Sequence, residues 1–136
     1  MLRVQSENLS NEFTAFIQSW FDLLANGQVA QACAAIDKPN SYGTRWTPEK
    51  ISELISDNFG PGTVFASEHP EGPVFTTTSR TKGNTKADVV QFRDGSGYSV
   101  EHDVPLNGEW SDLTAQFEFL GTPPDFEVIL HDLHVL

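Results

Sequence analysis

The C-terminal run from Ala87 to Leu136 constrains the fold most strongly, because apolar and polar residues alternate through it and turn signals interrupt it three times. The letters DGSG at 94–97 and NG at 107–108 are typical of hairpin turns, and residues 121–125 form a third turn that contains two prolines. The run therefore predicts a meander of four antiparallel strands.

Strict alternation assigns faces to the two middle strands of this meander. Tyr98, Val100, His102 and Val104 are expected on the buried face, and Glu101 and Asp103 on the wet face. The strand after the NG turn has the same pattern. Its inward-facing residues are Leu113, Ala115, Phe117 and Phe119. Thr114, Gln116 and Glu118 face outward. The final strand, 126–136, is apolar at both parities, as in a central strand or one with a bulge.

Helical spacing dominates the first 60 residues. The stripe that runs from Phe13 through Trp20 to Leu24 predicts a helix with Ser10 as N-cap, and a shorter helix follows from Val29. The sequence TPE at 47–49 starts a third helix, with threonine as N-cap and proline at the first helical position. We predict a short strand at residues 63–66 and a long connection over residues 67–85.

These elements predict one α+β domain over residues 1–136, with helices at about 10–60 and the sheet at about 63–136. A chain of 136 residues forms one complete core and is too short for two ordinary domains. Three N-terminal helices are expected to pack on the antiparallel sheet.

The negative charge is concentrated in the sheet. The formal net charge is -11, and all eight basic residues lie at or before Arg93, whereas nine of the 19 acidic residues follow it. Nucleic acid and anionic membranes repel such a surface, so we expect neither as a partner. A basic protein would be attracted. The alternative is that the acidity serves solubility alone.

Cys33 is the single cysteine, so no internal disulfide can form. Its place on the apolar side of the second helix predicts a small buried hydrophobe. The first 11 residues lack the apolar core of a signal peptide, and the sequence contains no run of about 20 apolar residues. These observations predict a cytoplasmic protein.

The order of elements, three helices and then a twisted antiparallel sheet, resembles the nuclear transport factor 2-like superfamily, also called cystatin-like. The sequences DVPLNGEWSDLTA at 103–115 and LHDLHVL at 130–136 resemble those of an uncharacterised group of small bacterial proteins. The resemblance implies a cone-shaped fold in which the curved sheet wraps the first helix. This chain abbreviates the hairpin that the superfamily places between its second and third helices, leaving only residues 40–46.

The resemblance also implies an alternative function, a small-molecule-binding or isomerase/dehydratase-like enzyme that uses a pocket between helices and sheet. Isomerases of the superfamily hold a carboxylate or histidine inside the cone. His102 faces inward, and Asp132 or His134 of the last strand would approach it, with a His102–Asp132 dyad as the sharpest form. Aromatic residues would line the pocket: Trp20, Tyr42, Trp46 and Trp110. The more common role of an inward histidine is that of a hydrogen-bonded core residue.

Neither a metal nor a cofactor is expected. His131 and His134 are three residues apart, which on a regular strand turns them to opposite faces. The sequence also lacks zinc-ligand spacing and a phosphate-binding glycine loop.

The outer face of the sheet favours a non-enzymatic protein-binding domain. Glu101, Asp103 and Glu118, with Gln116 between them, form a predicted contact surface for a basic partner. Within the superfamily this suits a bacterial immunity or accessory protein that blocks a basic toxin. A surface so negative resists pairing with itself, so we expect a monomer or weak homodimer. The remaining alternatives are a solvated face without a partner and a stable domain of uncharacterised role.

Overall fold

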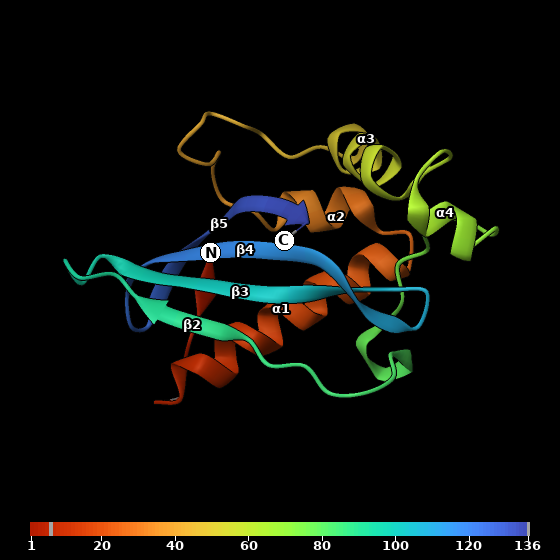
Figure 1. The fold of residues 1–136 in the computed structure, drawn as a ribbon. Coiled ribbons are helices and arrows are strands. Elements are labelled where there is room, and N and C mark those ends of the chain that lie inside the picture. Colours follow the sequence, from red (N-terminus) through yellow and green to blue (C-terminus); the bar gives the residue numbers. More distant parts are fainter. Residues whose placement is uncertain (6, 136) are drawn as a thin grey trace.

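Helices cover one face of a curled antiparallel sheet in the computed structural model, which describes residues 1–5 and 7–135 (Figure 1). The helical elements are α1 (Leu9–Ala25), α2 (Val29–Ala34), α3 (Pro48–Phe59), α4 (Val64–Glu68) and the 3-10 turn η1 (Thr78–Arg80). The strands are β1 (Leu2–Arg3), β2 (Asp88–Gln91), β3 (Gly97–Leu106), β4 (Glu109–Thr122) and β5 (Asp125–Val135). Their order in the sheet is β1-β5-β4-β3-β2, and all pairings are antiparallel. The predicted α+β class and the four-stranded meander are confirmed.

The aromatic stripe of α1 fills the concave side of the sheet. Phe13 stacks on Phe119 of β4 with ring centroids 4.3 Å apart, and Trp20 meets Phe117 edge-on at 5.2 Å. All four side chains are at most 1% exposed. Complete burial of a large apolar side chain contributes about 1.5–3 kcal/mol, so this layer is a main source of the fold's stability.

Three local predictions differ from the structure. Residues 64–68 form the helix α4 rather than a strand, because the Thr63 hydroxyl caps it by accepting the Ala66 N–H at 3.2 Å. Helix α1 starts at Leu9, capped by Asn8 instead of Ser10. Two residues at the N-terminus add the strand β1, and the predicted strand end at Leu136 lies outside the described residues.

A bulge interrupts β5, which is one of the two explanations that its mixed apolar pattern allowed. Gln116 pairs with Asp132 while its neighbour Phe117 pairs with Leu130, so His131 is the extra residue. A bulge turns two consecutive side chains toward the same side of a strand. His131 therefore joins Asp132 on the outer face.

The loop between α2 and α3 covers the edge of β5 beyond its short pairing with β1. The Asp37 carboxylate accepts a hydrogen bond from the Val128 N–H at 2.6 Å, and the Asp37 N–H donates to the Val128 carbonyl at 2.8 Å. The Asn40 side chain donates to the His131 carbonyl at 2.9 Å, and the Trp46 indole donates to the Leu130 carbonyl at 2.8 Å. These bonds satisfy backbone groups that a free edge would leave open.

Asn40→Ala tests the importance of this loop. Asn40 is 8% exposed, and its side-chain oxygen also accepts the N–H groups of Tyr42 and Thr44 at 3.0 and 2.9 Å. Because three polar groups would lose their partner, we expect the free energy of unfolding to fall by about 2–4 kcal/mol in urea denaturation. The control Asn58→Ala removes an exposed bond to the Leu54 carbonyl and should cost less than about 1 kcal/mol. Equal losses in both variants would contradict the role of the loop.

Candidate functional site

The register of the sheet gathers acidic side chains on its outer face. Glu101 of β3 pairs with Asp88 of β2 on one side and with Gln116 of β4 on the other, and Gln116 pairs with Asp132 of β5. Side chains that are directly opposite share a face. These four residues therefore form one row across four strands.

Two further carboxylates flank this row, one in each neighbouring row. Ser99 pairs with Glu118 and Asp103 with Thr114, which places both acids on the same side as Glu101. We call the following set the acidic face: Asp88, Glu101, Asp103, Gln116, Glu118 and Asp132. Sequence parity anticipated four of its members but left out Asp88 and Asp132, because their positions depend on strand pairing.

Hydrogen bonds hold part of the acidic face in place. The Thr85 hydroxyl donates to the Asp103 carboxylate at 3.1 Å, and the Gln116 amide donates to the Ser99 hydroxyl at 3.4 Å. Lys86 lies beside the β2 edge of the face, in a small cleft shared with Asp88, Glu101 and Asp103. The carboxylates nevertheless outnumber this cation, so the face is negative.

Two histidines border the acidic face on β5. His131 Nδ1 lies 3.7 Å from a Glu118 carboxylate oxygen, and His134 Nδ1 lies 3.3 Å from Asp132. Both nitrogens are shielded from solvent and make no hydrogen bond with the described residues. The prediction that His131 and His134 face opposite sides is wrong, because the bulge shifts the parity of the strand.

His102 is a core residue with both ring nitrogens occupied. It is 1% exposed, and its Nδ1 lies 2.8 Å from the Asp103 carbonyl, which only accepts, so Nδ1 carries the proton. Nε2 then accepts from the Gln18 amide at 3.2 Å. Burial lowers the pKa of His102 below its ordinary value, although the Asp103 carbonyl and charge act in the opposite direction. His102 is therefore a neutral imidazole with both nitrogens partnered inside the core.

The predicted dyad does not form. Asp132 pairs with Gln116 on the outer face, whereas His102 pairs with Ala115, which is fully buried on the inner face. Asp132 contacts His134, which also lies on the outer face opposite Thr114. The sheet itself separates both candidates from His102.

The four aromatic residues expected around one pocket lie apart. Trp20 is 1% exposed in the core, and its indole donates to the Ala32 carbonyl at 2.8 Å, while Tyr42 is 80% exposed on the α2–α3 loop. Trp110 packs 5.5 Å from His102 and donates to the Gly83 carbonyl. Trp46 borders a separate pocket, described next. The expectation that these residues share a pocket is therefore wrong.

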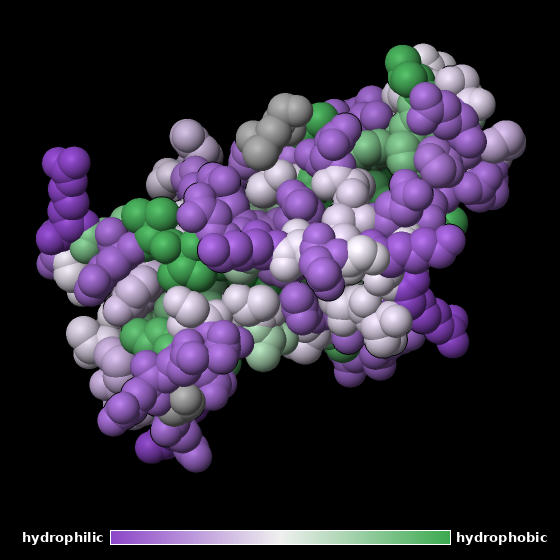
Figure 2. All heavy atoms as spheres, turned by 60° about the horizontal axis from the view of Figure 1, so that its bottom comes forward, coloured by the Kyte–Doolittle hydropathy of each residue, from purple (hydrophilic) through white to green (hydrophobic). Residues whose placement is uncertain are grey.

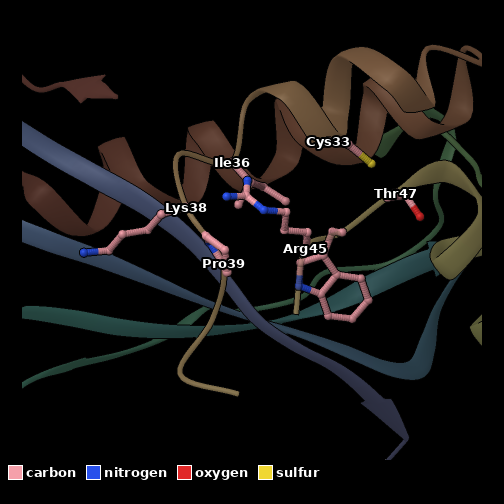
Figure 3. Close-up of a pocket in the computed structure, with 7 residues that line it drawn as sticks. Cys33, Ile36, Lys38, Pro39, Arg45 and Thr47 are labelled. Atoms are coloured by element: carbon pink, nitrogen blue, oxygen red, sulfur yellow. The ribbon is translucent and has the colours of Figure 1, made fainter. Parts of the chain in front are cut away.

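The pocket beside Trp46 is a cleft of about 170 Å³ between α2 and the loop that follows it (Figure 3). In Figure 3 Arg45 reaches toward Ile36, whereas Lys38 points away from it. Cys33 also borders the cleft, and burial together with the nearby charge of Glu49 raises the pKa of its thiol. Because the thiolate is the nucleophile, this cysteine is poorly suited to covalent chemistry.

Within the described residues, acidic, histidine and cysteine side chains form no group of three that could hold a metal ion. In the same part of the chain, none of the helices combines the length and the apolar character needed to span a bilayer.

The structure thus defines an α+β protein with a curled antiparallel sheet and an acidic outer face. The chain belongs to a family described as a domain of unknown function, DUF7668, whose model matches residues 21–136. The match begins inside α1 and includes the rest of the helical layer and strands β2 to β5. No curated protein and no solved structure matches the chain.

The lowered pKa of His102 predicts a pH-dependent stability. The unfolded chain binds a proton near the ordinary value of 6.5, whereas the folded chain resists it, so the free energy of unfolding should fall as pH drops below 6.5. Thermal unfolding at pH 5.5 and 7.5 measures this difference. His102→Gln should reduce it, whereas His69→Gln should preserve it. If stability depended on pH identically in wild type and His102→Gln, the lowered pKa of His102 would not be its cause.

Proposed function

We propose that this protein is a non-enzymatic binding domain that engages a basic protein through its acidic face. The supporting observation is the row of Asp88, Glu101, Gln116 and Asp132 across four strands, flanked by Asp103 and Glu118. Opposed potentials speed the encounter of two proteins and select among partners.

The energetics of the face support a binding role. Like charges on neighbouring strands destabilise a sheet slightly, so the clustered carboxylates have a small stability cost. The sequence contains no lysine or arginine after Arg93, so β3, β4 and β5 carry no such cation to neutralise the face. A cationic partner would supply the missing charge.

The finer proposal is a bacterial immunity or accessory protein with a nuclear transport factor 2-like fold. The N-terminal helices seated in a curled antiparallel sheet are compatible with that superfamily. A toxin that attacks nucleic acid presents a basic active-site surface, and carboxylates are suited to block it in place of phosphates. The single cysteine, Cys33, is consistent with a cytoplasmic site of action.

The packed interior gives little support to the enzymatic alternative. A general acid or base needs access to substrate, whereas His102 is buried between Phe21 and Trp110 and both its nitrogens are engaged. Asp132 and His134 lie on the other side of the sheet.

Charge reversal on the acidic face tests the proposal. A pull-down with the wild-type chain from cells that produce it, followed by mass spectrometry, identifies basic partners, with the product of the adjacent gene as the first candidate. The double variant Glu101→Lys/Glu118→Lys should weaken binding of the purified partner at least about ten-fold, because it replaces attraction by repulsion. Isothermal titration calorimetry measures the affinity.

The matched control is Glu53→Lys/Glu68→Lys, which makes the same charge change at exposed positions of α3 and α4. It should change the affinity less than about two-fold at 0.15 M salt, where charges farther apart than about 8 Å are screened. Equal effects of the two double variants would show that net charge, rather than the acidic face, governs binding.

A further inference from the structure

We propose that the basic partner binds by adding an extended segment as a further strand along the free edge of β2. The inference rests on the proposed function, because the segment belongs to the protein that the acidic face attracts. Strand addition supplies main-chain hydrogen bonds for affinity, while alternate side chains supply specificity.

The backbone of β2 is oriented for such an addition. The strand is the last in the sheet order, with β3 on one side only. Phe92 donates its N–H to the Gly97 carbonyl at 2.9 Å, and this pair continues the register of Val90 with Ser99. In an antiparallel ladder, the backbone N–H and C=O groups of one residue point toward the partner strand and those of the next residue point away from it. Val90 therefore bonds toward β3, and Val89 points its N–H and C=O outward.

Two outward N–H groups of β2 have no partner among the residues that the structure describes. By the same alternation Gln91 also points away from β3, and the N–H groups of Val89 and Gln91 make no hydrogen bond with the described residues. On the other side of the sheet the edge strand β1 is only two residues long, and beyond it Asp37, Asn40 and Trp46 bond β5. Among the described strands, β2 offers a ready template for pairing.

The outer side chains of β2 specify the chemistry of the segment. Asp88 begins the row that continues through Glu101 to Asp132, so a lysine or arginine beside Asp88 would extend this row with the opposite charge. Val90 is 55% exposed, and an apolar residue beside it would cover its side chain. Lys86, two residues before Asp88, borders the same small cleft and would repel a second cation. The segment therefore carries one basic residue two positions from an apolar one.

The inner side of the edge has room for the intervening side chains. A groove of about 480 Å³ lies between the start of α1 and residues 85–89, and polar residues of α1 line its floor: Ser10, Asn11 and Thr14. Figure 2 brings the lower side of Figure 1 forward, where hydrophilic residues surround small hydrophobic groups. Small polar side chains, such as threonine, fit this lining.

The test uses a capped, fluorescent peptide in which threonine alternates with one lysine and one valine two positions apart. Val89→Pro removes an outward N–H without touching the bonds of Asp88 and Val90 to β3, a position where an edge strand tolerates proline. Val89→Thr keeps the N–H and serves as the control. We expect saturable binding to wild type, an affinity loss of about ten-fold or more in Val89→Pro, and a change below about two-fold in Val89→Thr.

Amide hydrogen exchange distinguishes strand addition from binding by charge alone. The peptide should slow exchange at Val89 and Gln91, and a glutamate in place of its lysine should abolish binding. Should Val89→Pro fail to fold, a peptide N-methylated on its edge-facing amides should bind wild type at least about ten-fold more weakly.

Absence of binding to wild type, or equal binding by Val89→Pro and wild type without protection of Val89, overturns the strand addition. The proposed function is judged separately by Glu101→Lys/Glu118→Lys and the captured partner. If that double variant loses the partner while Val89→Pro binds it as wild type does, the acidic face stands and the edge proposal fails. If neither variant weakens the partner, both fail.

Discussion

The packing of α1 into the concave side of the sheet is the constraint on which the rest of the structure depends. Phe13 and Trp20 bury their rings against Phe119 and Phe117, and this contact fixes which face of β4 points inward. A shift of one residue in register would turn these phenylalanines to water and the carboxylates to the core. The outward position of Glu118 on β4 follows from this aromatic layer, and pairing with β4 carries the same orientation to Glu101 on β3.

The two edges of the sheet differ in how their backbone groups are bonded. The loop between α2 and α3 bonds the edge of β5 through Asp37, Asn40 and Trp46. It closes this edge with few residues. The edge of β2 keeps outward N–H groups beside the acidic face.

His102 shows how the core satisfies a buried polar side chain. His102 uses one nitrogen on a backbone carbonyl and the other on Gln18, and aromatic rings surround it. An uncharged imidazole with two partners costs little to bury. The carboxylates of the acidic face lie on the other side of the sheet, where water reaches them and moderates their mutual repulsion.

The sequence alone determined the elements whose signal is local. Helical spacing placed α1, the threonine and proline at 47–48 placed the start of α3, and strict alternation placed Glu101 and Glu118 outside and Val100 inside. Only the tertiary structure decided which residues meet across strands. The bulge at His131 changed the parity of β5, carried Asp132 away from His102 and joined it to the acidic face. Such outcomes depend on pairing between distant segments, where one extra residue reverses every side chain beyond it. The mixed apolar pattern of β5 allowed a bulge but did not give its position.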